Sequence, residues 1–413
     1  MNKKRTFITG MGVISSLGNT TEELFNNLVE NRSNIKCYEE WKKLNGLRSF
    51  LGAPAFDYDS KQIPRTLRRG MSRMSEMAYL ATIMALEQAG ISLNFENKTM
   101  DFSRTVINLG STVGSPEANE EYHRKMFDNG GPAGQLATTF FKVMNHSVAA
   151  NVAVALGYKG PLLSTSSACS TSLHAAILGA ELVGAGLYDV AVVGGADELH
   201  YSGASTFDVV QAASINYNDR PDFASRPFDK DRDGLVISEG ASILVIESEE
   251  HAKKRNAKII AEVLGGAYFC DGSHLAHPNA ETMTHTMQLA LKKSGLSASK
   301  IDYVNAHATS TVVGDIEESK AIYELFKDKV PVSSFKGHLG HALAACGLIE
   351  LIASITMMKK DLIIPTRNLE NIDPLCAAIC LPTKKSHCKV NTIVKNSFAF
   401  GGMNASLVVQ NCL

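Results

Sequence analysis

The sequence predicts an α/β protein whose strands lie in largely parallel sheets. Short apolar runs alternate with helical patterns along the 413 residues, and this alternation is typical of α/β layers. Most of the runs are apolar at every position rather than at every second one, as expected when helices cover both faces of a sheet. A chain of this length can bury a large core and is expected to form two or more domain-sized units.

The expected elements follow one another in a regular order. Strands are expected at residues 6–8, 105–109, 190–193, 242–246, 259–263, 303–305, 330–333 and 393–396. Helices are expected at residues 21–31, 74–89, 281–294, 316–326 and 342–359. The charged run 247–258 is expected to form a further helix that leads into the next strand.

The two halves of the chain resemble each other in a weak internal repeat. Each contains a long helix rich in alanine and glycine, which follows Cys169 in the first half and His341 in the second. The charged run near residue 250 separates the halves, and no low-complexity segment or long linker interrupts them. We therefore expect residues 1–250 and 251–413 to form two similar halves of one rigid body.

The composition favours a soluble cytoplasmic protein that does not bind nucleic acid. The 41 basic and 42 acidic residues nearly cancel, whereas phosphate binding calls for a broadly basic surface. The eight cysteines form no Cys-x-x-Cys pair, so free thiols in a reducing compartment are expected. Thr9, Gly10 and Gly12 interrupt the N-terminal apolar segment, and Glu350 interrupts the apolar region 342–358, so neither a signal peptide nor a membrane span is expected.

Cys169 is a candidate nucleophile. It lies in Ser-Thr-Ser-Ser-Ala-Cys-Ser-Thr-Ser, and the following run 170–186 has helical spacing, so Cys169 is expected in the first turn of a helix. Unpaired N–H groups and the helix dipole favour a thiolate there, and the small neighbours leave room for a bulky acyl group. The alternative is that Cys169 is only a small buried hydrophobic residue.

Motifs in the second half favour the catalytic interpretation. Asn-Ala-His-Ala-Thr-Ser-Thr places His307 after an expected strand, and Lys-Gly-His-Leu-Gly-His places Lys336, His338 and His341 before an expected helix. Asn-Ser-Phe-Ala-Phe-Gly-Gly-Met-Asn at 396–404 predicts a glycine-bearing turn between two apolar strands. A thiol, two histidines and a glycine-rich turn can supply a nucleophile, proton handling and oxyanion donors.

These motifs resemble the β-ketoacyl-(acyl carrier protein) synthases of the type I and II condensing-enzyme group. The resemblance runs from Ile-Thr-Gly-Met-Gly near the N-terminus to Ala-Ser-Leu-Val at 405–408, and includes Gly-Gly-Ala-Asp-Glu at 194–198 and Ala-Ser-Arg-Pro-Phe-Asp at 224–229. It implies the thiolase fold: two similar α/β halves in a five-layered arrangement, with central helices that meet and an active site between the halves.

The resemblance also implies catalytic roles. Cys169 would accept the acyl group, while His307 and His341 would flank the thioester carbonyl of an incoming malonyl unit. Lys336 would be a supporting cation, and Glu350 would hold the polar network around it. The implied reaction is a decarboxylative Claisen condensation with malonyl-acyl carrier protein that yields a β-ketoacyl carrier.

Further residues are expected to bind and gate the substrate. By the resemblance, Thr309 and Thr311 would contact the phosphopantetheine arm of the carrier. Phe400 would gate the pocket, and its backbone N–H would form the oxyanion hole together with that of Cys169. No metal or redox cofactor is expected. Zinc on His338 and His341, with Cys169 and His307, is the alternative, but three of these groups already have organic roles and the histidine spacing is not the helical i, i+4.

The resemblance also implies macromolecular partners. An acidic acyl carrier protein is expected to dock on basic residues, for which an ordinary solvated face is the alternative. The candidate docking residues are Arg65, Arg68, Arg69, Arg124 and Lys125. Two such subunits are expected to pack together, as a homodimer or as a heterodimer with a related subunit like a chain-length factor.

Several alternatives stay open at the level of the sequence. Most family members carry Gly where this chain has Ala308 and Ala399, Thr where it has Met403, and a small or apolar residue in place of His338. An Ala forced to positive φ would reshape its turn. These departures leave open a fatty-acid enzyme or the catalytic ketosynthase of a specialised type II polyketide or polyene system. A thiolase acting on CoA thioesters and a non-catalytic chain-length partner are the rival functions.

Overall fold

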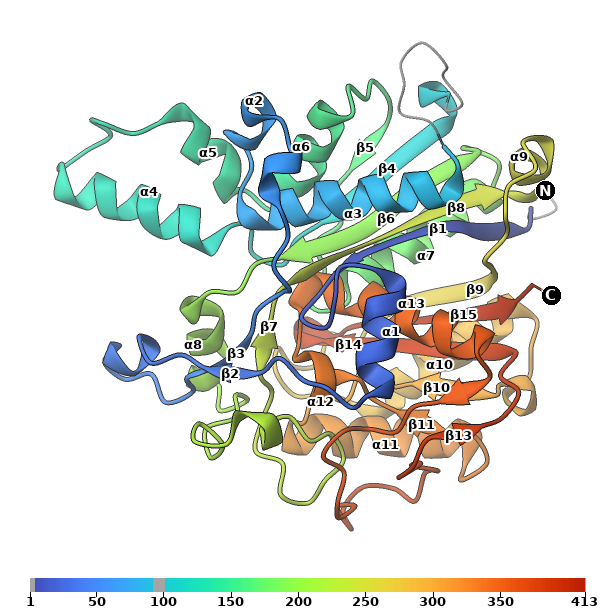
Figure 1. The fold of residues 1–413 in the computed structure, drawn as a ribbon. Helices are drawn as coiled ribbons and strands as arrows, with labels where there is room; N and C mark the ends of the chain where they lie inside the picture. The colour runs from blue at the N-terminus through green and yellow to red at the C-terminus, as the bar shows by residue number, and fades with distance from the viewer. Residues whose placement is uncertain (1–3, 92–100, 413) are drawn as a thin grey trace.

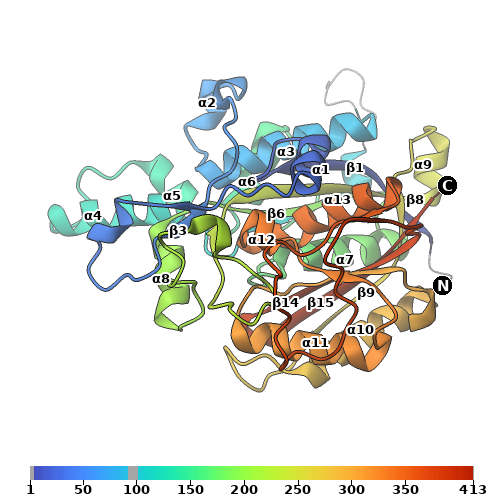
Figure 2. The ribbon, with the colours of Figure 1, turned by 60° about the horizontal axis from the view of Figure 1, so that its bottom comes forward.

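Helices and strands alternate in five layers. The computed structural model describes residues 4–91 and 101–412, and its layers run helix, sheet, helix, sheet, helix (Figure 1). The helices α7 (Thr171–Gly184) and α13 (Cys346–Lys359) form the middle layer, as Figure 2 shows from a second direction. This is the five-layered arrangement with central helices that the family resemblance implied.

The first half of the chain builds the sheet on one side of this middle layer. Its strands are β1 (Thr6–Ile14), β4 (Thr105–Gly110), β5 (Leu162–Leu163), β6 (Val190–Asp197) and β8 (Gly240–Ser248). They lie in the order β5-β4-β6-β8-β1, with parallel pairing from β5 to β6 and antiparallel pairing from β6 to β1. The helices α3 (Arg73–Ala89) and α6 (Ser147–Ala155) cover the outer face (Figure 1).

The second half repeats this construction. Its strands are β9 (Ala261–Cys270), β10 (Tyr303–Asn305), β11 (Val332–Ser333), β14 (Thr392–Ala399) and β15 (Met403–Asn411). They lie in the order β11-β10-β14-β15-β9, parallel from β11 to β14 and antiparallel from β14 to β9. The helices α10 (Ala280–Ser294) and α11 (Val312–Phe326) form the outer layer.

The two halves therefore share one topology. Strand order and strand direction agree between them, although the sequence repeat is weak. The edge strands β1 and β9 pair antiparallel, with Thr6 opposite Val263, and this pairing joins the halves into a continuous ten-stranded sheet. The predicted resemblance between the two halves is confirmed as a repeat of the same fold topology.

The prediction of largely parallel sheets is wrong. Within the ten-stranded sheet, parallel pairing is confined to the outer strands of each half, and every pairing from β6 through β1 and β9 to β14 is antiparallel. The turn Phe400–Gly402 between β14 and β15 is too short for a crossover helix, so these two strands must run in opposite directions. The strands are apolar throughout because helices cover both faces of the sheet. A continuous apolar pattern therefore indicates that a strand is buried and does not indicate whether it runs parallel to its neighbours.

Shorter elements decorate this framework. The additional helices are α1 (Thr21–Val29), α2 (Arg65–Arg68), α4 (Pro116–Asp128), α5 (Ala137–Val143), α8 (Tyr201–Val209), α9 (Glu249–Lys254) and α12 (Lys336–Leu339). The additional strands are β2 (Lys36–Cys37), β3 (Leu51–Ala53), β7 (Ile237–Ser238), β12 (Leu362–Ile363) and β13 (Ser386–His387). The sequence pattern does not predict α4, because Ala118 is its one buried residue and no apolar stripe forms. Across the described ranges, no helix combines the length and the apolar character that crossing a membrane requires.

The two central helices approach each other closely at Gly347 of α13. A Cβ added there would lie 3.0 Å from the Cβ of Leu173 on α7 and 3.1 Å from the Oγ of Ser172. The same Ser172 hydroxyl accepts a hydrogen bond from the backbone N–H of Leu348 at 3.2 Å. The alanine- and glycine-rich character of both helices thus permits the contact that places the ends of the two halves together.

Candidate active site

Cys169 lies on a tight turn that leads into α7. The first helical residue is Thr171 and the N-cap is Ser170, so Cys169 precedes the helix and the prediction that it lies in the first turn is wrong. Ala168 has a φ of 48°, a left-handed conformation that costs an alanine roughly 1–2 kcal/mol. The Thr171 hydroxyl donates to the Ala168 carbonyl at 2.7 Å and accepts the Ser167 backbone N–H at 2.9 Å. These bonds hold the strained turn and so fix the position of the thiol.

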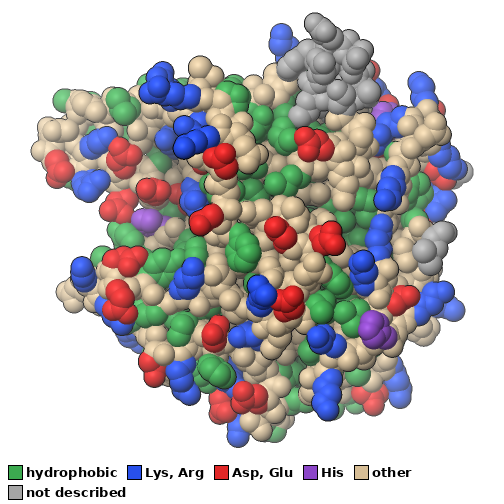
Figure 3. All heavy atoms as spheres, in the orientation of Figure 1, with side chains coloured by type: hydrophobic (Ala, Val, Ile, Leu, Met, Phe, Trp, Pro, Cys, Tyr) green, Lys and Arg blue, Asp and Glu red, His purple; other side chains and the backbone are tan. Residues whose placement is uncertain are grey.

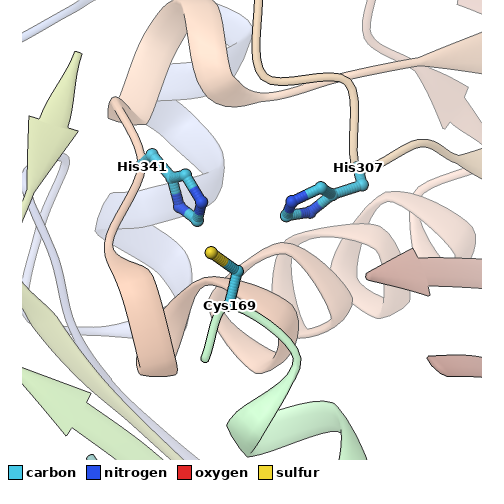
Figure 4. Close-up of side chains that lie close together, drawn as sticks. All are labelled: Cys169, His307 and His341. Carbon is cyan, nitrogen blue, oxygen red and sulfur yellow. The ribbon is translucent and has the colours of Figure 1, made fainter. Parts of the chain in front are cut away.

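Two histidines from the second half face this thiol. His307 follows β10, and His341 follows α12. Ligand atoms of Cys169, His307 and His341 all lie within 4.8 Å of one another, and Figure 4 shows both rings directed toward the sulfur. The ring centroids are 5.3 Å apart and the rings are almost perpendicular, at 82°. Nδ1 of both histidines is buried without a hydrogen-bond partner among the described residues.

The protonation of the site follows from its burial. Burial holds the pKa of His307 and His341 well below the usual value for histidine, and the ammonium groups of Lys336 and Lys395 act in the same direction. Both imidazoles are therefore neutral at pH 7. Burial also raises the pKa of the Cys169 thiol, and the Cys346 thiol adds to this effect. The expected thiolate is not the resting form, because burial outweighs the partial charges at a helix that begins two residues later.

The two lysines that help to lower the pKa of these histidines belong to a buried ion network. Lys336 of α12 pairs with Glu350 of α13, as the resemblance implied. The Nζ of Lys395 on β14 lies 2.5 Å from the second carboxylate oxygen of Glu350. Lys395 is not among the residues predicted from the sequence, although a single lysine in the apolar run Thr-Ile-Val-Lys-Asn-Ser-Phe-Ala is a visible signal. All three side chains are buried, so their charges are felt strongly by their neighbours.

Glu318 is a second residue that the sequence analysis missed. Its carboxylate on α11 accepts the backbone N–H of His307 at 2.8 Å and that of Ala308 at 2.6 Å, which fixes the loop after β10. Neither Ala308 nor Ala399 is among the residues with positive φ, and Ala399 is extended, with a φ of −102°. The strain expected from alanine at these positions is therefore absent. Positive φ falls instead on Gly401 and Gly402 in the turn after Phe400.

A pocket of about 250 Å³ leads to the thiol. Thr309, Thr311 and Phe400 line it together with Cys169 and the two histidines, so the structure brings the predicted binding and gating residues to one cavity. The hydroxyls of Thr309 and Thr311 lie 3.1 Å apart. The side chain of Phe400 is 36% exposed, and its ring centroid lies 5.7 Å from that of Phe207, another lining residue. The role of its backbone N–H in an oxyanion hole stays a prediction.

The candidate docking residues lie away from this pocket. Arg65 and Arg68 belong to α2 and Arg69 follows it, while Arg124 and Lys125 belong to α4. Arg65, Arg69 and Arg124 are exposed, and basic side chains gather over the α2 end of the molecule in Figure 3. Lys125 is paired with Glu121 of the same helix, with Nζ and the carboxylate 2.5 Å apart.

The spacing of the central three residues also bears on metals. Thiolate and imidazole are zinc ligands, and ligand atoms within 4.8 Å of one another are close enough for a single ion. The prediction of a metal-free site therefore stays a prediction, and chelation tests it.

The sequence and the structure both match known proteins. The family model described as "Beta-ketoacyl synthase, N-terminal domain" matches residues 3–252, and "Beta-ketoacyl synthase, C-terminal domain" matches residues 260–370. The chain is 37% identical to 3-oxoacyl-(acyl-carrier-protein) synthase 1 of Haemophilus influenzae, over 98% of this chain and 99% of the relative. A crystal structure of a beta-ketoacyl synthase from Burkholderia phymatum has a TM-score of 0.95 at 36% identity, covering 99% of this chain and 100% of that one. The ishigamide ketosynthase/chain length factor structure has a TM-score of 0.89 at 27% identity, and both chains are fully covered.

Proposed function

The chain belongs to the β-ketoacyl synthase family, and we propose that it joins an acyl group on Cys169 to a malonyl unit carried by acyl carrier protein. The observation that carries this proposal is the convergence of Cys169, His307 and His341 at the end of one pocket. The enzyme is an acyltransferase that performs a decarboxylative Claisen condensation and releases a β-ketoacyl carrier.

The first step transfers the acyl group to Cys169. The sulfur attacks the thioester carbonyl of the acyl carrier, an S–C bond forms, and the bond to the carrier sulfur breaks. Because the resting group is a thiol, its proton must be removed during attack, and the neutral imidazoles of His307 and His341 are near enough to accept it. The proton then passes to the departing carrier thiolate.

The second step makes the carbon nucleophile. The malonyl unit enters the emptied pocket, its bond to the carboxylate carbon breaks, and CO2 leaves with the electron pair retained as an enolate. The enolate oxygen needs hydrogen-bond donors, which the neutral imidazoles of His307 and His341 provide. Such donors are typically worth roughly 3 kcal/mol each in the transition state. No carboxylate base is required, since loss of CO2 generates the carbanion.

The third step joins the two fragments. The enolate carbon attacks the carbonyl of acyl-Cys169, a C–C bond forms, and the sulfur of Cys169 leaves as a thiolate. The thiolate takes one proton from solvent, because the thiol proton left with the carrier in the first step and decarboxylation releases none. The β-ketoacyl product remains on the carrier. Thr309 and Thr311 lie on the pocket wall, where their hydroxyls suit the polar groups of a phosphopantetheine arm.

The rival functions have less support. A thiolase needs a second cysteine that abstracts a proton, and Cys346 is the nearest candidate. Its Sγ is buried and donates to the Cys169 carbonyl at 3.3 Å, and burial raises its pKa to about 11, so it is poorly placed to be a base. A non-catalytic chain-length partner would be expected to lack the nucleophile, whereas Cys169 is present and lines the pocket.

We also propose partners for this chain. The basic residues of α2 and α4 would receive an acidic acyl carrier protein by electrostatic attraction. The edge strand β5 is open on one side among the described strands, and its Leu162 and Leu163 are about two-fifths exposed (42% and 40%). An apolar sheet edge of this kind suits strand pairing with a second β-ketoacyl synthase chain, either a second copy or a chain-length-factor-like subunit.

Intact-protein mass spectrometry with a panel of acyl carrier thioesters tests the first step. A mass increase equal to one acyl group, mapped to Cys169, supports the proposal and reveals the preferred chain. Acylation without elongation after malonyl carrier is added would indicate a missing partner subunit. Failure of every donor to acylate Cys169 would overturn the assignment of the nucleophile.

A further inference from the structure

Lys395 places a charge in the layer that carries the active site. Side chains of β14 alternate between its two faces: Ile393 and Ala399 pack into the core around α7 and α13, whereas Val394 and Phe398 pack into the core beneath α10 and α11. The alternation puts Lys395 on the same face as Ile393. It meets Glu350 of α13 there and is 0% exposed.

Glu350 does not need Lys395 for neutralisation. Its carboxylate already pairs with Lys336, and each ammonium binds a different carboxylate oxygen. The three groups together carry one excess positive charge in a buried setting, which is expensive unless it interacts with something nearby. Replacing one such lysine by an apolar residue would leave a complete Lys336–Glu350 pair, so pairing alone gives no reason for Lys395.

Other titratable groups near the histidines are committed elsewhere. The Glu318 carboxylate accepts backbone N–H groups of the His307 loop, and the Asp197 carboxylate accepts the Ser111 hydroxyl and the Ala344 backbone N–H. The other titratable groups of this core are the Lys336 ammonium, which pairs with Glu350, the Tyr303 hydroxyl, which hydrogen-bonds with Ser333, and the thiols of Cys169 and Cys346. Within the described residues, the Lys395 ammonium forms a hydrogen bond and an ion pair with one group, the Glu350 carboxylate.

Lys395 on β14 lies opposite Asn305 of β10, and His307 follows Asn305 by two residues. We propose that Lys395 is a positioning residue of this site, whose ammonium adds to the effect of burial on His307 and His341 and helps to keep both imidazoles uncharged during decarboxylation. The inference rests on the proposed function, because only that reaction requires neutral imidazoles as hydrogen-bond donors. A positive charge disfavours a second positive charge nearby, and the low polarity of the interior strengthens the effect. The same charge favours the anionic enolate.

The charge state of Lys395 is the condition for this role. Burial lowers its pKa, while the Glu350 carboxylate at 2.5 Å favours the charged form. Lys395 in turn helps to lower the pKa of both histidines, after burial and Lys336 for His341, and after burial, Lys336 and His341 for His307. Loss of the Lys395 charge should therefore raise the pKa of both histidines. The acid limb of the pH–rate profile, on which activity falls as the histidines become protonated, should move to higher pH.

The test compares variants that separate charge from size. Lys395→Met and Lys395→Gln remove the charge, whereas Lys395→Arg retains it, and Lys359→Met removes an exposed lysine from the end of α13 as a control. Decarboxylation of malonyl-acyl carrier protein is followed between about pH 5 and pH 8. We expect the acid limb of the pH–rate profile to move to higher pH in the Met and Gln variants and to stay in place in the Arg and control variants.

Titration of His307 and His341 by NMR measures their protonation directly and does not depend on catalysis. His307 and His341 should become protonated at a higher pH in Lys395→Met and Lys395→Gln than in the unaltered protein. The unaltered enzyme could decarboxylate while the variants change neither the acid limb of the pH–rate profile nor the pH at which the histidines protonate. That result overturns the inference on Lys395, and the proposed function stands. An equal loss of rate at every pH would likewise show a packing role only. If the unaltered enzyme releases no CO2 from any malonyl carrier, the proposed function fails and the NMR titration still decides the inference.

Discussion

Gly347 of α13 lies directly against Leu173 of α7, with only 3.0 Å between a Cβ added at the glycine and the Cβ of the leucine. Cys169 comes just before one of these helices, and His341 lies five residues before the other. Their contact therefore sets the distance between the nucleophile of the first half and a histidine of the second.

Substitution of Gly347 should disturb stability and activity together. Gly347→Val adds a branched side chain at a site where atoms of Leu173, Ser172 and Ser397 lie within 3.1 Å of the added Cβ. Overpacking of this kind typically lowers the free energy of unfolding by about 1–3 kcal/mol. Urea denaturation and the condensation rate measure the two effects. Gly131→Ala is the matched control, because a Cβ at Gly131 has no neighbour within 4 Å. Unchanged stability in Gly347→Val would contradict the close contact of the two helices.

His307→Ala should separate the two half-reactions. The variant keeps Cys169 and His341 and should still be acylated, but it loses one donor to the enolate oxygen, which typically lowers the rate by about 10²- to 10³-fold. Acylation is read from the intact mass and decarboxylation from released CO2. Loss of acylation with normal decarboxylation would contradict the role assigned to His307.

The thiol of Cys169 should react slowly at neutral pH. Because burial raises its pKa, the thiolate fraction is small at pH 7, and alkylation by iodoacetamide should keep rising with pH beyond about pH 9. Peptide mass spectrometry resolves Cys169 from the exposed Cys270, which is the internal reference for access. A plateau below about pH 8 would instead indicate a stabilised thiolate, as the position before a helix suggested.

Chelation should leave the activity unchanged. The proposed reaction uses Cys169, His307 and His341 as nucleophile and hydrogen-bond donors, and a bound ion would occupy the same atoms. Dialysis against EDTA followed by the condensation assay, with zinc added back in a parallel sample, measures this. A loss of activity that zinc restores would show that the site is a metal site.

Charge on the β5 edge should weaken subunit association. Leu162→Lys and Leu163→Lys place ammonium groups on an exposed apolar edge strand, and lysine on an edge opposes strand pairing. Light scattering after size-exclusion chromatography should show a dimer for the unaltered chain alone, or with its partner subunit, and a monomer for the variants. Variants that associate as the unaltered chain does would place the interface elsewhere.

Much of the fold and site can be predicted from the sequence. The apolar runs predict the major strands, and the motifs around Cys169, His307, His341 and Lys336 name residues that the structure brings together. Strand direction cannot be predicted in this way, because a strand buried on both faces has the same pattern in either direction. The polar helix α4 also escapes prediction, since Ala118 is its one buried residue.

The electrostatics of the site are the other part that the sequence does not supply. The protonation of Cys169 depends on how deeply the fold buries it, and the position just before a helix suggests the opposite direction. Lys395 is noticeable as a charge in an apolar strand, but its partner Glu350 is on another element and 45 residues away. Only the packing of β14 against α13 joins them.

The most direct test of the central claim is product analysis with this chain alone, an acyl carrier thioester and malonyl-acyl carrier protein, compared with Cys169→Ala. The account predicts a β-ketoacyl carrier two carbons longer than the starting acyl group, equimolar CO2, and neither acylation nor elongation in the variant. Elongation that persists in Cys169→Ala would contradict the mechanism.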